Sequence, residues 1–177
     1  VCVIDKSGSM RGEKITLVRK TFQYLLQYLS DSGRLSIVIF DHEASRLFPL
    51  SRITEENKDK IIQKIATILP DCGGTNIARG MKHAFEILKQ RRERNPLSSI
   101  VLLSDGHDKG AQDRVAQEIK KFGADVKDTT IHTFGFGNDH DPQLMTDIAA
   151  LRGGNFYFIQ KLDTVDEAFV DCLGGLL

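Results

Sequence analysis

Oxygen donors occupy alternate positions near the start of the chain, in the segment Asp5-Lys6-Ser7-Gly8-Ser9. Residues at i and i+2 of an extended turn project to the same side, so one carboxylate and two hydroxyls can face a single point. Gly8 gives the backbone the freedom to bend between the serines. Hard oxygen donors suit Mg²⁺, Mn²⁺ or Ca²⁺ rather than Zn²⁺ or Cu²⁺. The spacing therefore predicts one side of a divalent-cation site, although polar turns that cap a helix can have the same pattern.

Two later segments carry donors that would complete this site. Asp105 closely follows a buried strand expected at residues 99–103, and Asp5 is the last residue of one expected at residues 1–5. Ligands of open α/β sheets bind at the carboxyl ends of strands, where the winding reverses, so neighbouring strands would bring both carboxylates to one ion. Thr75 follows two glycines at the start of an expected helix, where the backbone can approach closely. The candidate metal-site residues are Asp5, Ser7, Ser9, Thr75 and Asp105.

The elements that would position these segments alternate between strand-like and helix-like runs. This alternation predicts an α/β, doubly wound, Rossmann-like three-layer sandwich, with a six-stranded, mostly parallel sheet and about six helices. Strands are expected at residues 1–5, 34–40, 44–50, 99–103, 130–136 and 155–159. Helices are expected at residues 11–30, 54–69, 77–92, 112–122, 142–151 and 164–173. The strand at 44–50 follows its predecessor too closely for a helical crossover, so we expect it to be the one antiparallel edge strand.

Length and charge limit the classes of function. The 177 residues fit one domain, residues 1–177, and Lys plus Arg equal Asp plus Glu at 24 each. A net charge of zero means that the chain has no excess of positive charge to attract nucleic acid or an acidic membrane surface. No apolar run has the length of a transmembrane helix. We expect a monomeric domain. Because the first residues read as the middle of a buried strand, we also expect a fragment of a longer protein.

The three cysteines are Cys2, Cys72 and Cys172. An odd number without close spacing argues against a disulfide framework. Cys2 and Cys172 would be able to pair if the two termini packed together. We favour the other interpretation, in which the cysteines are small buried hydrophobic residues in a reducing compartment.

The three polar segments together resemble the complete metal-ion-dependent adhesion site of the von Willebrand factor A and integrin I family. The resemblance covers essentially the whole chain, including the order of strands and helices. It implies that Ser7, Ser9 and Thr75 ligate Mg²⁺ (or Ca²⁺ or Mn²⁺) through their hydroxyls. It also implies that Asp5 and Asp105 act close by, directly or through waters and hydrogen bonds. One coordination position would remain for an Asp or Glu carboxylate of a protein partner.

Residues around this site are expected to form a rim that touches the partner. The rim set is Lys6, Gly74, Asn76 and His107. A solvated loop is the plainer interpretation for His107, and the same two interpretations apply to Asp108 and Lys109. Asp139 and Asp141 could suggest a second cation, but capping of the helix that begins at Pro142 explains them better.

A narrower resemblance concerns the segments 46–50, 91–96 and 134–141. These segments are similar to the intracellular eukaryotic branch of the family, in which the A domain accompanies a RING finger or U-box in ubiquitin ligases of the WAVY GROWTH type. This resemblance implies a cytoplasmic location and a domain that recruits a ligase partner or substrate. The sequence contains no RING or U-box array of cysteines and histidines, so ligase activity would lie outside this chain.

Two other functions compete with a cation-dependent binding module. A magnesium-dependent phosphohydrolase of the haloacid dehalogenase type also begins with an aspartate after its first strand. It needs a second aspartate two residues later, where this chain has Ser7, and no other nucleophile–base pair is evident. We therefore expect no enzyme activity. The third interpretation is an interaction domain whose metal site is empty.

Overall fold

The central sheet determines where the candidate site lies. The computed structural model describes residues 1–161 and 164–174. Its strands are β1 (Cys2–Asp5), β2 (Arg34–Phe40), β3 (Ala44–Arg52), β4 (Ser98–Ser104), β5 (Thr129–Phe136) and β6 (Phe156–Ile159). They form one sheet in the order β3-β2-β1-β4-β5-β6. β3 pairs with β2 in the antiparallel direction, and the other pairings are parallel. The predicted six-stranded sheet with an antiparallel edge strand is confirmed.

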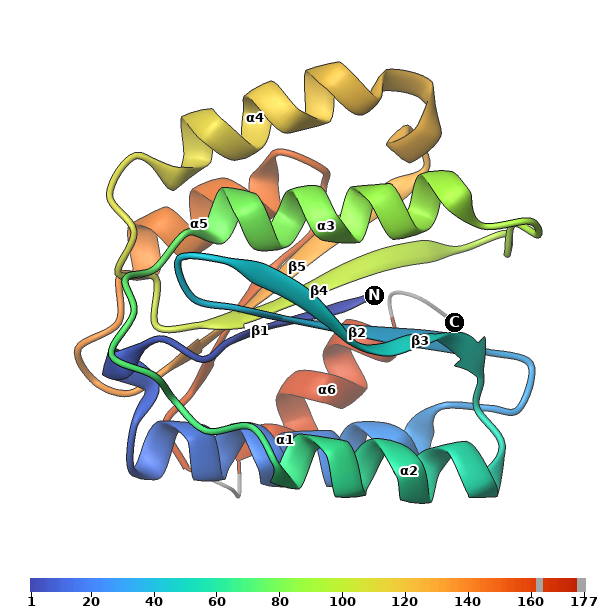
Figure 1. Ribbon diagram of the computed structural model, residues 1–177, viewed down its shortest axis with the longest axis horizontal. Coiled ribbons are helices and arrows are strands. Elements are labelled where there is room, and N and C mark those ends of the chain that lie inside the picture. The colour runs from blue at the N-terminus through green and yellow to red at the C-terminus, as the bar shows by residue number, and fades with distance from the viewer. Residues whose placement is uncertain (162–163, 175–177) are drawn as a thin grey trace.

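Helices cover both faces of this sheet (Figure 1). The helices are α1 (Glu13–Tyr28), α2 (Glu55–Ala66), α3 (Ile77–Gln90), α4 (Ala111–Phe122), α5 (Pro142–Ala150) and α6 (Val165–Gly174). Two 3₁₀ turns, η1 (Gly8–Met10) and η2 (Gly123–Val126), precede α1 and follow α4. Figure 1 shows α1, α2 and α6 on one face and α3, α4 and α5 on the other. The predicted three-layer sandwich is therefore confirmed.

The alternation of side chains in β1 explains why this strand is central. Cys2 and Ile4 pack in the core under α1, whereas Val3 packs in the core under α3. All four residues of β1 are buried, as a strand covered on both faces requires. Gly80 lets α3 approach the sheet closely, because a Cβ there would lie 2.8 Å from the Phe40 ring and 2.9 Å from a methyl carbon of Val3. Helix α3 is thereby held beside the strand that leads into the candidate site.

Several predicted boundaries differ from the structure by one to three residues. Helix α1 begins at Glu13, because the preceding residues form η1 and Gly12 adopts φ +75°. Helix α2 ends at Ala66, since the amides of Thr67 and Ile68 close tighter turns at 3.1 Å. The last three residues of the expected domain, 175–177, lie outside the described part of the chain.

The cysteines correct one prediction. Cys2 and Cys172 are buried free thiols, as expected, but Cys72 is exposed. Cys72 lies in the loop before α3, where its thiol accepts a hydrogen bond from the Arg11 guanidinium at 2.9 Å. The expectation of a buried thiol is wrong there, because a polar loop rather than a packed element surrounds this residue.

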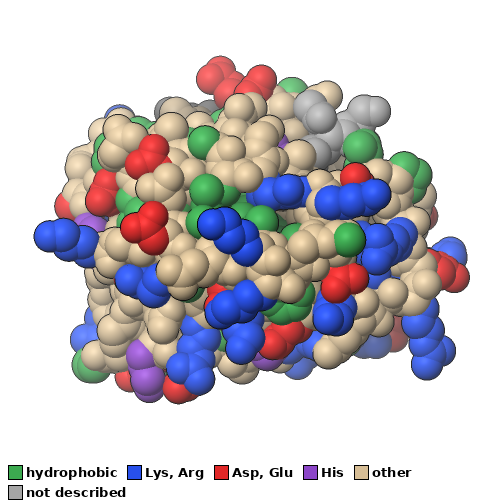
Figure 2. All heavy atoms as spheres, turned by 90° about the horizontal axis from the view of Figure 1, so that it is seen from above, with side chains coloured by type: hydrophobic (Ala, Val, Ile, Leu, Met, Phe, Trp, Pro, Cys, Tyr) green, Lys and Arg blue, Asp and Glu red, His purple; other side chains and the backbone are tan. Residues whose placement is uncertain are grey.

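The surface carries basic and acidic side chains together, in agreement with the balanced composition. Figure 2 shows basic and acidic side chains interspersed over the face that α3 and α4 cover. Within residues 1–161 and 164–174, no helix is both long and apolar enough to cross a membrane.

Candidate metal centre

The two carboxylates of the candidate site leave the sheet from neighbouring strands. β1 and β4 are parallel, with Ile4 paired to Leu103, so Asp5 and Asp105 follow at the same edge. The chain adds β2 and β3 on one side of β1 and then places β4 on the other side. The reversal of winding lies between β1 and β4, which is where ligands of such sheets bind. The predicted position of the two carboxylates at the reversal is therefore confirmed.

The β1–α1 loop brings the first carboxylate and both serines together. The Ser7 amide donates to Asp5 Oδ1 at 2.8 Å, and the Ser7 and Ser9 hydroxyl oxygens lie 3.1 Å apart. Asp5 and Ser7 are buried, whereas Ser9 is exposed. Gly12 is the N-cap of α1 and makes no side-chain cap, so the serines do not serve as the cap of this helix. The loop therefore presents two adjacent hydroxyls that the helix does not use.

Ser104 links the two strand ends, and sequence reasoning missed it. Its hydroxyl donates to Asp5 Oδ2 at 2.6 Å and accepts from the Gly106 amide at 3.0 Å. Both oxygens of Asp5 are thus engaged by neighbouring donors. Burial raises the pKa of Asp5 to about 6, although the hydrogen bonds from Ser104 and Ser7 oppose the rise. This geometry suits a carboxylate that orients hydroxyl ligands rather than one that takes the cation alone.

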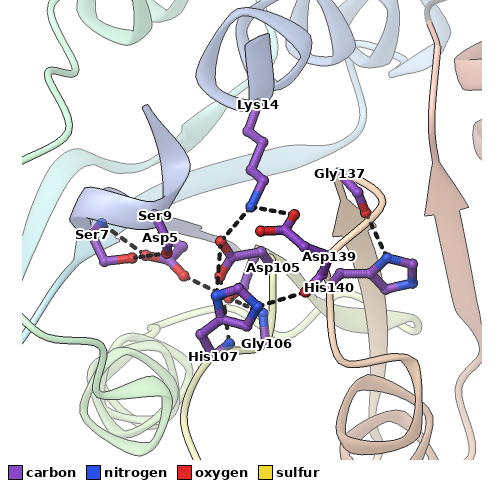
Figure 3. A network of polar contacts seen from close by, with 11 residues as sticks. Asp5, Ser7, Ser9, Lys14, Asp105, Gly106, His107, Gly137, Asp139 and His140 are labelled. Carbon is purple, nitrogen blue, oxygen red and sulfur yellow. Dashed lines mark hydrogen bonds and ion pairs between the residues drawn. The ribbon is translucent and has the colours of Figure 1, made fainter. Parts of the chain in front are cut away.

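The second carboxylate, Asp105, has a cation beside it. Asp105 is fully buried, and its Oδ2 accepts from the Lys14 ammonium at 2.9 Å. The same ammonium lies 2.8 Å from Oδ1 of Asp139 in the β5–α5 loop. His107 is exposed, with Nδ1 3.5 Å from Asp105 Oδ2 and Nε2 2.6 Å from the Asp139 carbonyl oxygen. Figure 3 shows these side chains converging from three segments of the chain.

The loop of Thr75 approaches the site from a third side. The Asp71 amide donates to the Lys6 carbonyl at 2.9 Å, and the Asn76 amide donates to the Asp41 carbonyl at 2.7 Å. Asn76, not Thr75, caps α3 by accepting from the Arg79 amide at 3.1 Å. Thr75 is half-buried, and within the described residues its hydroxyl has no hydrogen-bond partner. The loop is therefore held against residue 6, while ligation by Thr75 itself remains a prediction.

Asp108 holds this third segment in place. Its Oδ2 accepts from the Ile77 amide at the start of α3 at 2.8 Å, and its Oδ1 accepts from the Arg114 guanidinium. Asp108 is 9% exposed, so the expectation of a solvated rim residue is wrong. Sequence reasoning missed its role because its partner Ile77 lies 31 residues away along the chain.

The predicted rim residues divide into two pairs. Lys6 forms an ion pair with Asp41, and Asn76 is the helix cap already described. Gly74 and His107 are exposed, and of the two His107 lies against Asp105. Asp141 caps α5 by accepting from the Leu144 amide at 3.0 Å, as expected, whereas Asp139 binds Lys14 instead of capping the helix.

The donor set favours some kinds of ion over others. Three of the five predicted residues offer hydroxyls, and only two offer carboxylates. Within the described residues, no three His, Cys, Asp or Glu side chains form a group that could hold a metal ion. A hydroxyl-rich set of hard oxygens fits a magnesium-class ion that retains several waters better than an ion that needs a cage of thiolates or imidazoles.

Comparison with known proteins identifies the family. Residues 1–158 match the model of the von Willebrand factor type A domain. The chain belongs to that family. It is 31% identical to the E3 ubiquitin-protein ligase WAV3 of Arabidopsis thaliana, over 100% of this chain and 22% of that protein. It is also 31% identical to the calcium-activated chloride channel regulator 1 of Bos taurus, over 96% of this chain and 18% of that protein. The chain thus spans about a fifth of the length of each of these two relatives.

Solved structures support the fold. A von Willebrand factor type A protein from Catenulispora acidiphila matches with a TM-score of 0.80 at 20% identity, over 96% of this chain and 40% of that one. Proximal thread matrix protein 1 from the mussel byssus, with its adhesion-site motif occupied by zinc, matches with a TM-score of 0.75 at 20% identity. That match covers 97% of this chain and 43% of the mussel chain. At these identities the likeness establishes the architecture.

Proposed function

We propose that the chain is a metal-ion-dependent protein-binding module. In this proposal, a magnesium-class cation at the β1–β4 edge presents a vacant coordination position to an Asp or Glu of a protein partner. The observation that carries it is the pair of Ser7 and Ser9 hydroxyls, 3.1 Å apart, above a buried Asp5 whose two oxygens already accept hydrogen bonds. Membership of a family of metal-dependent interaction modules supports the same proposal.

Each predicted residue would have a distinct role. Ser7, Ser9 and Thr75 would ligate the cation through hydroxyl oxygens. Asp5 would hold Ser7 in place through the 2.8 Å hydrogen bond from its amide, and Asp105 would act from the adjacent strand end. Because few charged ligands would surround the cation, it would stay electrophilic enough to bind an incoming carboxylate strongly. The bound metal supplies Lewis acidity at the open position, and we propose no enzyme reaction.

The proposal also includes a cellular role for the domain. A relative over the whole chain is named an E3 ubiquitin-protein ligase, so we propose that this domain recruits a partner or substrate for such an enzyme. The ligase chemistry itself would lie outside the 177 residues. A monomeric domain of residues 1–177 with a location inside the cell remains our expectation; it follows the relative named a ligase, while relatives named chloride channel regulators match this chain at the same identity.

Thermal melting with MgCl₂ tests the proposal. We expect millimolar Mg²⁺ to raise the melting temperature of the wild-type chain, because a ligand that binds the folded state stabilises it. The double variant Ser7→Ala with Ser9→Ala should lose this shift. A matched control is Ser30→Ala with Ser32→Ala, because those exposed serines have the same spacing and lie 2.7 Å apart at the other end of α1. The control should keep the shift.

Two results would overturn the proposal. The first is the absence of any shift in the wild-type chain at millimolar Mg²⁺, which would favour an interaction domain without a functional metal site. The second is turnover of a generic phosphate ester that disappears in Asp5→Asn, which would favour the phosphohydrolase alternative.

A further inference from the structure

Lys14 lies at a position that its own helix disfavours. It is the second residue of α1, within the first turn, where the helix dipole is positive and a cation is unfavourable. Gly12, the N-cap, supplies no side-chain acceptor there. A residue that contradicts a local structural preference in this way often has a function. The charge of Lys14 therefore needs an explanation outside the helix.

The Lys14 side chain lies against the β5–α5 loop. The Lys14 side chain is only 13% exposed, and its ammonium bridges Asp105 and Asp139 at 2.9 and 2.8 Å. Gly137 adopts φ +85°, and a Cβ at that position would collide with Lys14 Cε. Figure 3 shows Lys14 reaching from α1 toward both carboxylates. Burial opposes the charge of Lys14, but the hydrogen bonds to Asp139 and Asp105 outweigh it and raise its pKa. Lys14 is therefore a mostly buried cation whose ammonium lies between two carboxylates.

The ion pair between Lys14 and Asp105 is part of the candidate metal centre. Asp105 is the second carboxylate of that centre, and its Oδ2 is the atom to which Lys14 donates. A divalent cation near Asp105 and the ammonium of Lys14 would be attracted by the same carboxylate and would repel each other. This repulsion is substantial because the carboxylate is fully buried and screening is weak there.

We propose that Lys14 is the internal counter-ion of the metal centre: it neutralises Asp105 when no cation is bound, and it lowers the affinity of the centre for Mg²⁺. This inference rests on the proposed metal-binding function. It assigns Lys14 a positioning and tuning role, since the side chain acts on the cation through Asp105. A chain without the Lys14 charge would depend on the divalent cation to balance Asp105.

Isothermal titration calorimetry with MgCl₂ tests the role of the charge. The chains compared are wild type, Lys14→Gln, Lys14→Met, Lys14→Arg and Lys20→Gln. We expect Lys14→Gln and Lys14→Met to bind Mg²⁺ at least about tenfold more tightly than wild type, because a nearby positive charge is removed. Lys14→Arg keeps the charge and should bind like wild type. Lys20→Gln is the matched control, because Lys20 is exposed on the same helix.

Circular dichroism against Mg²⁺ concentration covers the case in which the charge-free variants fold poorly. We expect Mg²⁺ to restore their helical signal, since the cation replaces the counter-ion. Variants that stay unfolded at every Mg²⁺ concentration would overturn the inference.

The remaining outcomes separate the inference from the function on which it rests. If wild type binds Mg²⁺ and the charge-free variants bind equally or more weakly, the inference fails and the metal-binding function stands. If neither wild type nor the variants bind Mg²⁺, both fail. If only the charge-free variants bind, the counter-ion role holds and the wild-type function is contradicted.

Discussion

The β1–α1 loop and the β4–α4 loop each bring one buried aspartate to the same edge of the sheet, but they hold it by different means. Asp5 accepts hydrogen bonds from the Ser7 amide and the Ser104 hydroxyl, both neutral donors. Asp105 accepts from the charged ammonium of Lys14. Two carboxylates of similar burial therefore differ in electrostatic environment, and they should respond differently to an added cation.

This difference indicates a division of labour within the site. Neutral donors leave the charge of Asp5 uncompensated, so burial can raise its pKa to about 6. A lysine ammonium compensates the charge of Asp105 and stabilises the protein when no metal is bound. In the proposed metal centre, the serine side would thus be the part that receives a cation, whereas the Asp105 side already has the Lys14 ammonium beside it. Substitutions at the two aspartates test this comparison.

The largest expected effect is on stability in Asp105→Asn. This substitution removes the buried anion of Lys14 and leaves the ammonium with Asp139, whose side chain is 65% exposed. Breaking a buried ion pair is costly, so we expect the free energy of unfolding in EDTA to fall by about 3 kcal/mol. Urea denaturation measures it, with the exposed Asp113→Asn as control. A loss no larger than that of the control would contradict the buried pair.

The second effect concerns the pH dependence of Asp5→Asn in EDTA. The pKa of Asp5 is about 6 in the folded chain against 3.8 ordinarily, so the folded state retains a proton that the unfolded state releases. Wild-type stability should therefore decrease as pH rises from about 4 to about 6, by up to about 3 kcal/mol. Asn cannot ionise, so the stability of Asp5→Asn relative to wild type should rise over this range and then level off. A difference between the two chains that stays constant from pH 4 to 7 would show that Asp5 is ionised throughout.

The smallest effect is expected for Asp139→Asn. Asp139 binds the same ammonium as Asp105 but is mostly exposed, so water screens the pair. We expect a stability loss of about 0.5 kcal/mol or less in EDTA, measured by urea denaturation beside Asp105→Asn. Equal losses of stability in the two variants would mean that Asp139 stabilises the Lys14 ammonium as much as Asp105 does. That result would contradict the special role given to the buried carboxylate of the β4–α4 loop.

The sequence predicted the fold and the outline of the site because these depend on local patterns. A continuous apolar run followed by an aspartate indicates a buried parallel strand that ends at the ligand-binding edge, and both β1 and β4 have this form. The short connection between β2 and β3 required an antiparallel pair. Two glycines before Thr75 indicated a close approach of that loop; Gly73 makes one, against Asp41 and His42, whereas Gly74 has open space around it.

The residues that the sequence could not reveal act through distant partners. Ser104 donates to a carboxylate 99 residues away, and Lys14 to one 91 residues away. No periodicity or spacing encodes such contacts, because they depend on which strands become neighbours. Lys14 did carry one local signal, a cation in the first turn of a helix, which contradicts the usual preference. Asp108 carried none, since an aspartate in a polar loop is ordinary.

The most direct test of the metal centre is its structure with manganese, which scatters anomalously and favours the same hard oxygen ligands as magnesium. Crystals grown with MnCl₂ should show one anomalous peak at the β1–β4 edge, about 2.1 Å from the hydroxyl oxygens of Ser7, Ser9 and Thr75. Asp5 should retain its hydrogen bond from the Ser7 amide. The absence of a peak at saturating Mn²⁺, or a peak that the two serines do not touch, would contradict the account.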